Sequence, residues 1–184
     1  MMSNRLAAVN RLGSIGVNER RVATAAELRA LAHPLRLRIL REVLDTPRTN
    51  AEIADRLGVN PATCLHHVRT LLGSGFIEPA TPRAGVNGIT EKPYKATKKS
   101  WHTDFDQAPG GAQPLARAAL DAFIAEASGP LAELSTSRLG VRLTEKHRHR
   151  FETKLEALLR EIARADRPDG ERWAIFIATH RRET

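Results

Sequence analysis

The chain has 184 residues, enough for one domain with an extension or for two small domains. Hydrophobic residues make up 41% of it and allow a packed core, whereas aromatic residues make up only 4%, which favours helices over sheets. The single cysteine, Cys64, excludes an intrachain disulfide and a cysteine-rich metal cluster. No apolar run approaches the roughly 20 residues of a membrane helix, and the N-terminus lacks a signal-peptide pattern. We therefore expect a cytoplasmic protein without membrane contact.

The positive charge of the chain, +8 in total, is concentrated in its first half. Residues 1–100 carry 16 Lys and Arg against 8 Asp and Glu, whereas residues 101–184 carry 13 of each kind. A basic region beside a neutral one is typical of a nucleic-acid-binding module joined to a part with a separate function. The alternative interpretation is that the charge serves solubility alone.

The first elements are an arm and two helices. Residues 1–23 have no steady apolar period and include several arginines, so we expect a flexible basic N-terminal arm. Thr24 and Glu27 have the spacing of a capping box, which predicts a helix that ends near Ala32. His33-Pro34 then interrupts the chain, and the apolar spacing of residues 34–44 predicts a second helix.

Two further helices follow in close succession. Thr49 to Glu52 forms a second capping box, which opens a helix to Leu57, and Gly58 can adopt the left-handed conformation of a helix end. Asn60-Pro61 starts the next helix at once, with Asn as N-cap and Pro in the first turn, and this helix runs to about Ser74. Two short helices joined by a tight turn containing Gly are typical of a helix-turn-helix.

The rest of the chain predicts a wing and a helical extension. Residues 76–80 and 92–97 can form two strands around a loop rich in Thr, Pro, Gly and Asn. We interpret residues 101–114 as a polar linker and residues 115–184 as a helical dimerisation or effector region. Its apolar spacing predicts a helix from Leu115 that Gly129-Pro130 must kink or split, a long helix from Thr144 to about Ala165, and a closing strand over residues 173–178. The expected fold is mainly α with a small β wing.

Several segments of residues 24–100 resemble ArsR-like winged-helix regulators. LAHPLRLRIL at residues 31–40 is similar to the opening helix pair of this family. NAEIADRLG at residues 50–58 is similar to the second helix of its members. Residues 61–77, with His67, Leu71 and Gly75-Phe76-Ile77, are similar to the recognition helix and the start of the wing. Tyr94-Lys95-Ala96-Thr97 looks like the returning wing strand.

The resemblance implies a homodimer that binds double-stranded DNA and represses transcription until a metal or small ligand binds. Metal-sensing members carry a Cys-x-Cys type motif leading into or on the second helix, where this chain has Thr49-Asn50-Ala51-Glu52 and no thiol. The resemblance therefore does not extend to metal sensing, and we predict no cofactor. Whether a small-molecule effector exists is left open by the sequence. Leu65 stands where the family often has Ser in the recognition helix, so one polar contact of the family is missing.

The helix that starts at Pro61 is the predicted recognition helix, because a helix fits the major groove and its outward residues reach base edges. We expect Thr63 and His66 to contact base edges, and Arg69 to contact a base or a phosphate. The backbone amides from Asn60 to Thr63 can hold a phosphate at the helix N-terminus. The outward set also includes Ala62 and Thr70. His67 either orients a phosphate or is a half-buried structural histidine.

Three cations of the wing, Arg83, Lys92 and Lys95, are expected to meet backbone phosphates or the minor groove. Such contacts supply affinity and salt dependence without sequence information. Lys98 and Lys99 could act in the same way or form a solvated charge pair.

Other functions find less support in the sequence. Cys64 occupies an apolar helical position and is interpreted as a core residue, and His147 and His149 point in different directions on a helix, which makes them poor joint metal ligands. No phosphate-binding loop, GxSxG or HExxH pattern occurs, so we expect no enzyme. The main alternative is a winged helix that contacts another protein and has little DNA affinity. A metal sensor built on Asp and His ligands is a further alternative.

Overall fold

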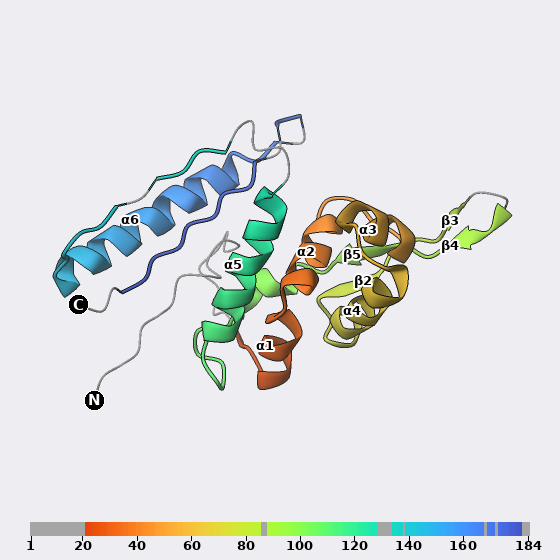
Figure 1. The fold of residues 1–184 in the computed structure, drawn as a ribbon, viewed down its shortest axis with the longest axis horizontal. Coiled ribbons are helices and arrows are strands. Elements are labelled where there is room, and N and C mark those ends of the chain that lie inside the picture. Colours follow the sequence, from red (N-terminus) through yellow and green to blue (C-terminus); the bar gives the residue numbers. More distant parts are fainter. Residues whose placement is uncertain are drawn as a thin grey trace.

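The computed structural model describes residues 21–85, 88–128, 134–137, 139–167, 169–171 and 173–181. Its elements follow the order β1 (Arg21–Val22), α1 (Ala25–Leu31), α2 (Pro34–Glu42), α3 (Asn50–Leu57), α4 (Pro61–Gly73), β2 (Ile77–Pro79), β3 (Arg83–Ala84), β4 (Thr90–Glu91), β5 (Tyr94–Ala96), the 3₁₀ helix η2 (Lys99–His102), β6 (Thr103–Asp104), α5 (Gln113–Ala127) and α6 (Glu145–Arg164). Helices α1 to α4 and the wing strands lie together, and α5 packs across α1 and α2 (Figure 1). The predicted class, mainly α with a small β wing, is confirmed.

Local capping residues set the helix bounds. The Thr24 hydroxyl accepts from the Glu27 amide, and the Glu27 carboxylate accepts from the Thr24 amide at 2.8 Å, so the first predicted capping box is present at α1. Thr49 and Glu52 make the same pair of contacts at α3. Gly58 ends α3 with φ +64°, the left-handed conformation that glycine adopts without steric strain. Two of the predicted helix starts thus have the structure that their sequence pattern indicates.

The core of the winged domain lies between α1–α4, α5 and the first wing strand. Its fully buried side chains are mostly aliphatic, with two phenylalanines, in line with the low aromatic content of the chain. They include Leu31, Ile39, Val43, Ile53, Val68, Leu71, Phe76 and Phe105. Because α4 contributes Cys64, Val68 and Leu71 to this core, one face of the helix is fixed inward and the opposite face must point to solvent.

The wing has two parts. Strands β2 and β5 pair antiparallel with Ile77 opposite Ala96, as the predicted strands 76–80 and 92–97 require. A second antiparallel pair, β3 with β4, continues outward within the segment that the sequence predicts as a loop. The hairpin that carries β3 and β4 projects away from the helices at the right of Figure 1.

The predicted linker, residues 101–114, differs from the structure. Strand β6 pairs in parallel with β1, and the Ala23 amide donates to the Asp104 carbonyl at 2.7 Å. Phe105 is 1% exposed, and its ring centroid lies 6.3 Å from that of Phe76. Residues 101–114 therefore complete the core, although their polar and Gly/Pro-rich composition predicts a linker. Residues 21–23, predicted as part of the arm, are likewise folded, and the rest of that arm lies outside the described residues.

The C-terminal region contains the two predicted helices but no closing strand. Helix α5 already begins at Gln113, inside the predicted linker, and α6 begins after Thr144, whose hydroxyl accepts from the His147 amide. Residues 173–178, predicted as a strand, form none, and the described C-terminal residues offer no strand to pair with. Phe176 instead stacks on Phe123 of α5, with centroids 4.7 Å apart. The predicted break at Gly129-Pro130 lies outside the described residues.

We expect Phe105→Ala to lower the free energy of unfolding by about 3–5 kcal/mol, because it removes a fully buried aromatic ring. Chemical denaturation followed by circular dichroism measures the change. Gln107→Ala, at an exposed position in the same segment, is the control and should leave stability almost unchanged. Equal stability of the two variants would mean that the segment is a linker after all.

Candidate nucleic-acid interface

Helix α4 presents a polar face to solvent. Ala62, Thr63, His66 and Arg69 are exposed, and they lie opposite the buried side chains Cys64, Val68 and Leu71. No ion pair to a described residue occupies Arg69, so its guanidinium is available for a ligand. The structure thus brings four of the predicted recognition residues onto one accessible surface.

The N-terminus of α4 is capped by its own chain. The Asn60 Oδ1 accepts from the Ala62 amide at 2.8 Å, and the Asn50 side chain donates to the Pro61 carbonyl at 3.0 Å. Asn60 therefore holds one of the amides that were predicted to bind a phosphate. Thr70, which was also predicted to point outward, is half-buried, and its hydroxyl donates to the His66 carbonyl one turn earlier at 3.2 Å.

His67 is a structural residue. It is 8% exposed, its ring lies 4.4 Å from that of His33, and its Nδ1 lies 3.4 Å from Arg36 Nη1. Burial, with a further contribution from His33 and Arg36, lowers the pKa of His67 to about 4, so the ring is neutral at pH 7. Of the two interpretations of His67, the buried one agrees with this geometry, whereas a phosphate contact does not.

Arg36 has a structural role that the sequence did not predict. Its guanidinium donates to the Ala30 carbonyl and, at 2.8 Å, to the Arg29 carbonyl, where the end of α1 leaves backbone acceptors without a helical partner. The same guanidinium faces His67 of α4. Arg36 therefore links the end of α1 to the recognition helix. Its position two residues after His33-Pro34 is the only sequence signal for this role.

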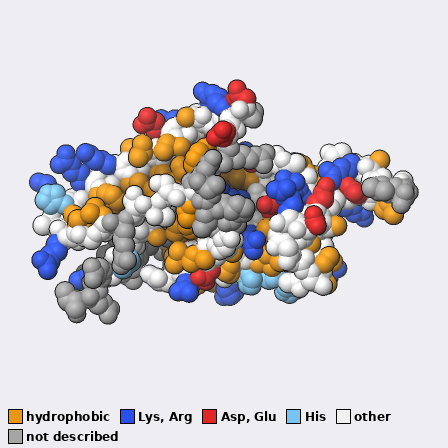
Figure 2. All heavy atoms as spheres, turned by 45° about the horizontal axis from the view of Figure 1, so that its top comes forward, with side chains coloured by type: hydrophobic (Ala, Val, Ile, Leu, Met, Phe, Trp, Pro, Cys, Tyr) orange, Lys and Arg blue, Asp and Glu red, His pale blue; other side chains and the backbone are white. Residues whose placement is uncertain are grey.

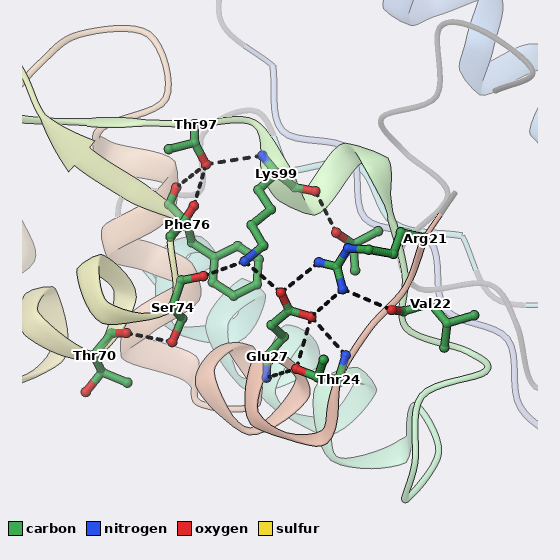
Figure 3. A network of polar contacts seen from close by, with 11 residues as sticks. Arg21, Val22, Thr24, Glu27, Thr70, Ser74, Phe76, Thr97 and Lys99 are labelled. Atoms are coloured by element: carbon green, nitrogen blue, oxygen red, sulfur yellow. Dashed lines mark hydrogen bonds and ion pairs between the residues drawn. The ribbon is translucent and has the colours of Figure 1, made fainter. Parts of the chain in front are cut away.

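A second link joins the other end of α4 to α1 (Figure 3). The Glu27 carboxylate is 11% exposed and contacts Arg21 Nη2 at 2.7 Å and Lys99 Nζ at 2.6 Å. Lys99 Nζ also donates to the Ser74 carbonyl, the cap of α4, at 2.6 Å. We call these contacts of Glu27, Arg21, Lys99 and Ser74 the Glu27 network. Hydrogen bonds from Arg21, Lys99 and Thr24 hold the pKa of Glu27 far below its usual range, despite the opposing effect of burial.

The Glu27 network settles what Lys99 does. Its ammonium is held between a carboxylate and a helix-end carbonyl and lies 5.1 Å from the centroid of the Phe76 ring. Neither predicted role, a phosphate contact or a solvated charge pair, fits a side chain with three such partners. Lys98 is exposed and lies over the Trp101 ring at 5.0 Å.

The three predicted wing cations have different partners. Arg83 contacts Glu52 of α3 at 2.5 Å and Glu91 of β4 at 2.8 Å, and Lys95 contacts Glu78 at 3.2 Å. Lys92 is exposed and has no ion pair among the described residues. Arg83 and Lys95 also line an open cleft of about 370 Å³ at the base of the wing, with Thr46, Pro47, Ala80, Thr81 and Pro93.

Two other site types find no geometric support in the part of the chain that the structure describes. No group of three or more His, Cys, Asp or Glu side chains is arranged to hold a metal ion there. None of its helices is long and apolar enough to cross a membrane. Cys64 is fully buried, and burial raises the pKa of its thiol, which agrees with its interpretation as a core residue.

We expect Lys99→Met to lower the free energy of unfolding by about 1–3 kcal/mol, because it leaves the Ser74 carbonyl and part of the Glu27 charge without a partner. Lys98→Met is the control with the same loss of charge on the neighbouring residue, and it should cost less than about 1 kcal/mol. Thermal and chemical denaturation measure both. An unchanged stability together with weaker DNA binding would instead assign Lys99 to the DNA.

Comparisons with known proteins agree with this geometry. Residues 31–80, which span α2, α3 and α4, match a family model described as a helix-turn-helix domain. A comparison with curated proteins gave no match. The helix-turn-helix match, with the wing that follows α4, establishes a winged helix-turn-helix fold.

Eleven chains of solved structures match, and the three described here are at most 21% identical to this chain. One is a homodimeric winged helix-turn-helix DNA-binding domain from Mycobacterium bovis, described as a possible ArsR-family transcriptional regulator; it is 21% identical, covers 61% of this chain and 86% of its own, and has a TM-score of 0.34. Another is a multiple antibiotic-resistance repressor from Listeria monocytogenes, 18% identical over 74% of this chain and 84% of its own, with a TM-score of 0.31. A third is ZitR of Lactococcus lactis in complex with DNA, 19% identical over 80% of this chain and 82% of its own, with a TM-score of 0.28. Similarity at this level does not carry a functional assignment to this chain.

Proposed function

We propose that this chain is a transcriptional regulator of the ArsR-like kind that binds double-stranded DNA as a homodimer and represses transcription. The observation that carries the proposal is the exposed face of α4, on which Thr63, His66 and Arg69 lie together while the opposite face is locked into the core. The positive charge of residues 1–100 supports it, because phosphate attraction supplies most of non-specific DNA affinity.

Sequence recognition in this proposal comes from the first turns of α4. Thr63 and His66 lie near the N-terminal end of the helix, where side chains reach base edges in the major groove. Arg69 follows one turn later and contacts a base or a phosphate. Lys92 and Lys95 contact the backbone beside the groove, and they add affinity without reading sequence.

The C-terminal region forms the dimer interface in this proposal. Helix α6 has no buried side chain although one of its faces is apolar, and in proteins most of the stability of a helix comes from packing of its apolar face. Large apolar side chains of α6 and its flanking segments are exposed, among them Leu139, Val141, Phe151, Leu158, Ile162 and Trp173. Figure 2 shows hydrophobic side chains gathered over the end of the molecule where α6 lies, away from the wing. A dimer formed through this region carries two recognition helices, which can contact two DNA half-sites one helical turn, about 34 Å, apart.

Repression follows if the dimer occupies DNA needed by the transcription machinery. A small-molecule effector, left open for the same C-terminal region by the sequence, would act by changing the spacing of the two recognition helices. The absence of thiols in residues 49–52 favours an effector other than a thiol-bound metal.

Fluorescence anisotropy with pooled duplexes, including DNA upstream of the gene itself, tests the DNA-binding proposal. We expect binding that weakens steeply with salt, and a loss of about 1–3 kcal/mol of binding free energy in Arg69→Ala. Arg150→Ala removes the same charge from an exposed position of α6 and is the control. Absence of binding to any duplex at low salt would contradict the proposal and favour a protein-contact module.

Sedimentation velocity tests the dimer. We expect the wild type to sediment as a dimer and Leu158→Glu to shift it toward the monomer, because a carboxylate replaces an exposed leucine on the apolar face of α6. Thr153→Glu adds the same charge to the other side of that helix and should leave the dimer intact. A monomeric wild type at micromolar concentration would contradict the assignment of this region to dimerisation.

A further inference from the structure

Arg83 is the wing cation with the most partners. Its Nη2 contacts Glu52 Oε1 at 2.5 Å, and its Nε contacts Glu91 Oε2 at 2.8 Å. We call these two contacts the wing ion pairs. They join the outer hairpin of the wing to helix α3, two elements that are far apart in the sequence. In Figure 2 acidic and basic side chains lie close together on the wing side.

The wing ion pairs lie at the surface. Arg83 is 43% exposed, Glu52 41% and Glu91 33%. Exposed ion pairs contribute little to stability, because water screens them and ordering the side chains opposes them. A DNA phosphate, which carries a full charge and accepts the same guanidinium geometry, can therefore compete with either carboxylate.

Both carboxylates are positioned by features other than Arg83. Glu52 is the third residue of α3 and also accepts from the Thr49 amide at 2.7 Å, so the capping box fixes its direction. Glu91 lies over Gly85, where an added Cβ would come within 2.6 Å of the Glu91 side chain. The absence of a side chain at Gly85 thus leaves the space in which Glu91 meets Arg83.

We infer that Glu52 and Glu91 hold Arg83 in an autoinhibitory contact, and that the arginine exchanges these carboxylates for a DNA phosphate when the wing engages the duplex. This inference rests on the proposed DNA-binding function. The two glutamates set the affinity of the wing for DNA without touching it. Lys92, which has no ion pair among the described residues, contacts phosphate without such an exchange.

The first test removes the carboxylate charges. Glu91→Gln and Glu52→Gln should each raise DNA affinity about two- to fivefold in the anisotropy measurement, the size expected for one exposed ion pair. Gln at position 52 keeps the capping box, because Gln serves there as Glu does. In an Arg83→Ala background the same substitutions should have almost no effect, since no arginine is left to release.

The second test moves Glu91 without changing any charge. Gly85→Ala should displace the Glu91 side chain, break its contact with Arg83 and raise affinity in the same direction as Glu91→Gln. Asp55→Asn, on the exposed surface of the same helix as Glu52, removes one negative charge without freeing Arg83 and serves as the control. It separates release of Arg83 from a general electrostatic gain.

The outcomes distinguish the inference from the proposed function. If Asp55→Asn raises affinity as much as Glu91→Gln, or if Glu91→Gln acts equally without Arg83, the exchange is overturned although DNA binding stands. An Arg83→Ala variant with an unchanged salt slope also overturns it, because one phosphate contact should contribute about 0.9 to that slope. A wild type that binds no duplex contradicts the proposed function itself.

Discussion

The arrangement of the winged domain depends on the contacts of the Glu27 carboxylate. The carboxylate lies almost out of water, and it is stable there because two cations and a backbone amide surround it. A buried charge with a missing partner is far more destabilising than an intact pair is stabilising. Through Lys99 the same carboxylate is connected to the carbonyl of Ser74, the cap of α4, so the start of α1, the end of α4 and the segment after the wing are tied at one point.

Helix α4 is thus held at two places by different kinds of contact. Near its middle, His67 packs as a neutral ring against His33, and Arg36 ties that contact to the end of α1. At its end, the Glu27 network supplies a charged contact. Between these points the aliphatic face of α4 fills the core. A rigid helix with one fixed face is what base recognition requires, because side chains must be positioned before the groove is met.

The two ends of the molecule differ in how many of their charged and apolar side chains have partners within the chain. In the winged domain, several cations have defined acidic or carbonyl partners, among them Arg36, Arg83 and Lys99, and the core is closed by Phe105 from beyond the wing. At the C-terminal end, α6 and its neighbours leave large apolar side chains in water. The winged domain needs no further surface to cover its core. The C-terminal end leaves an apolar surface without a partner, and the proposed homodimer would cover it with a second copy of the chain.

The sequence by itself determined what depends on near neighbours. The capping boxes at Thr24 and Thr49, the Asn60-Pro61 start and Gly58 act within a few residues, so the helix bounds and the helix-turn-helix followed from them. Only the tertiary structure decided which charges meet. Lys99 and Arg83 look alike in the sequence as surface cations, yet one is held beside Glu27 and the other by Glu52 and Glu91, because their partners are distant in the chain. The burial of Phe105 and the missing strand at residues 173–178 have the same cause, since a strand requires a partner and a buried ring requires a cavity that other segments form.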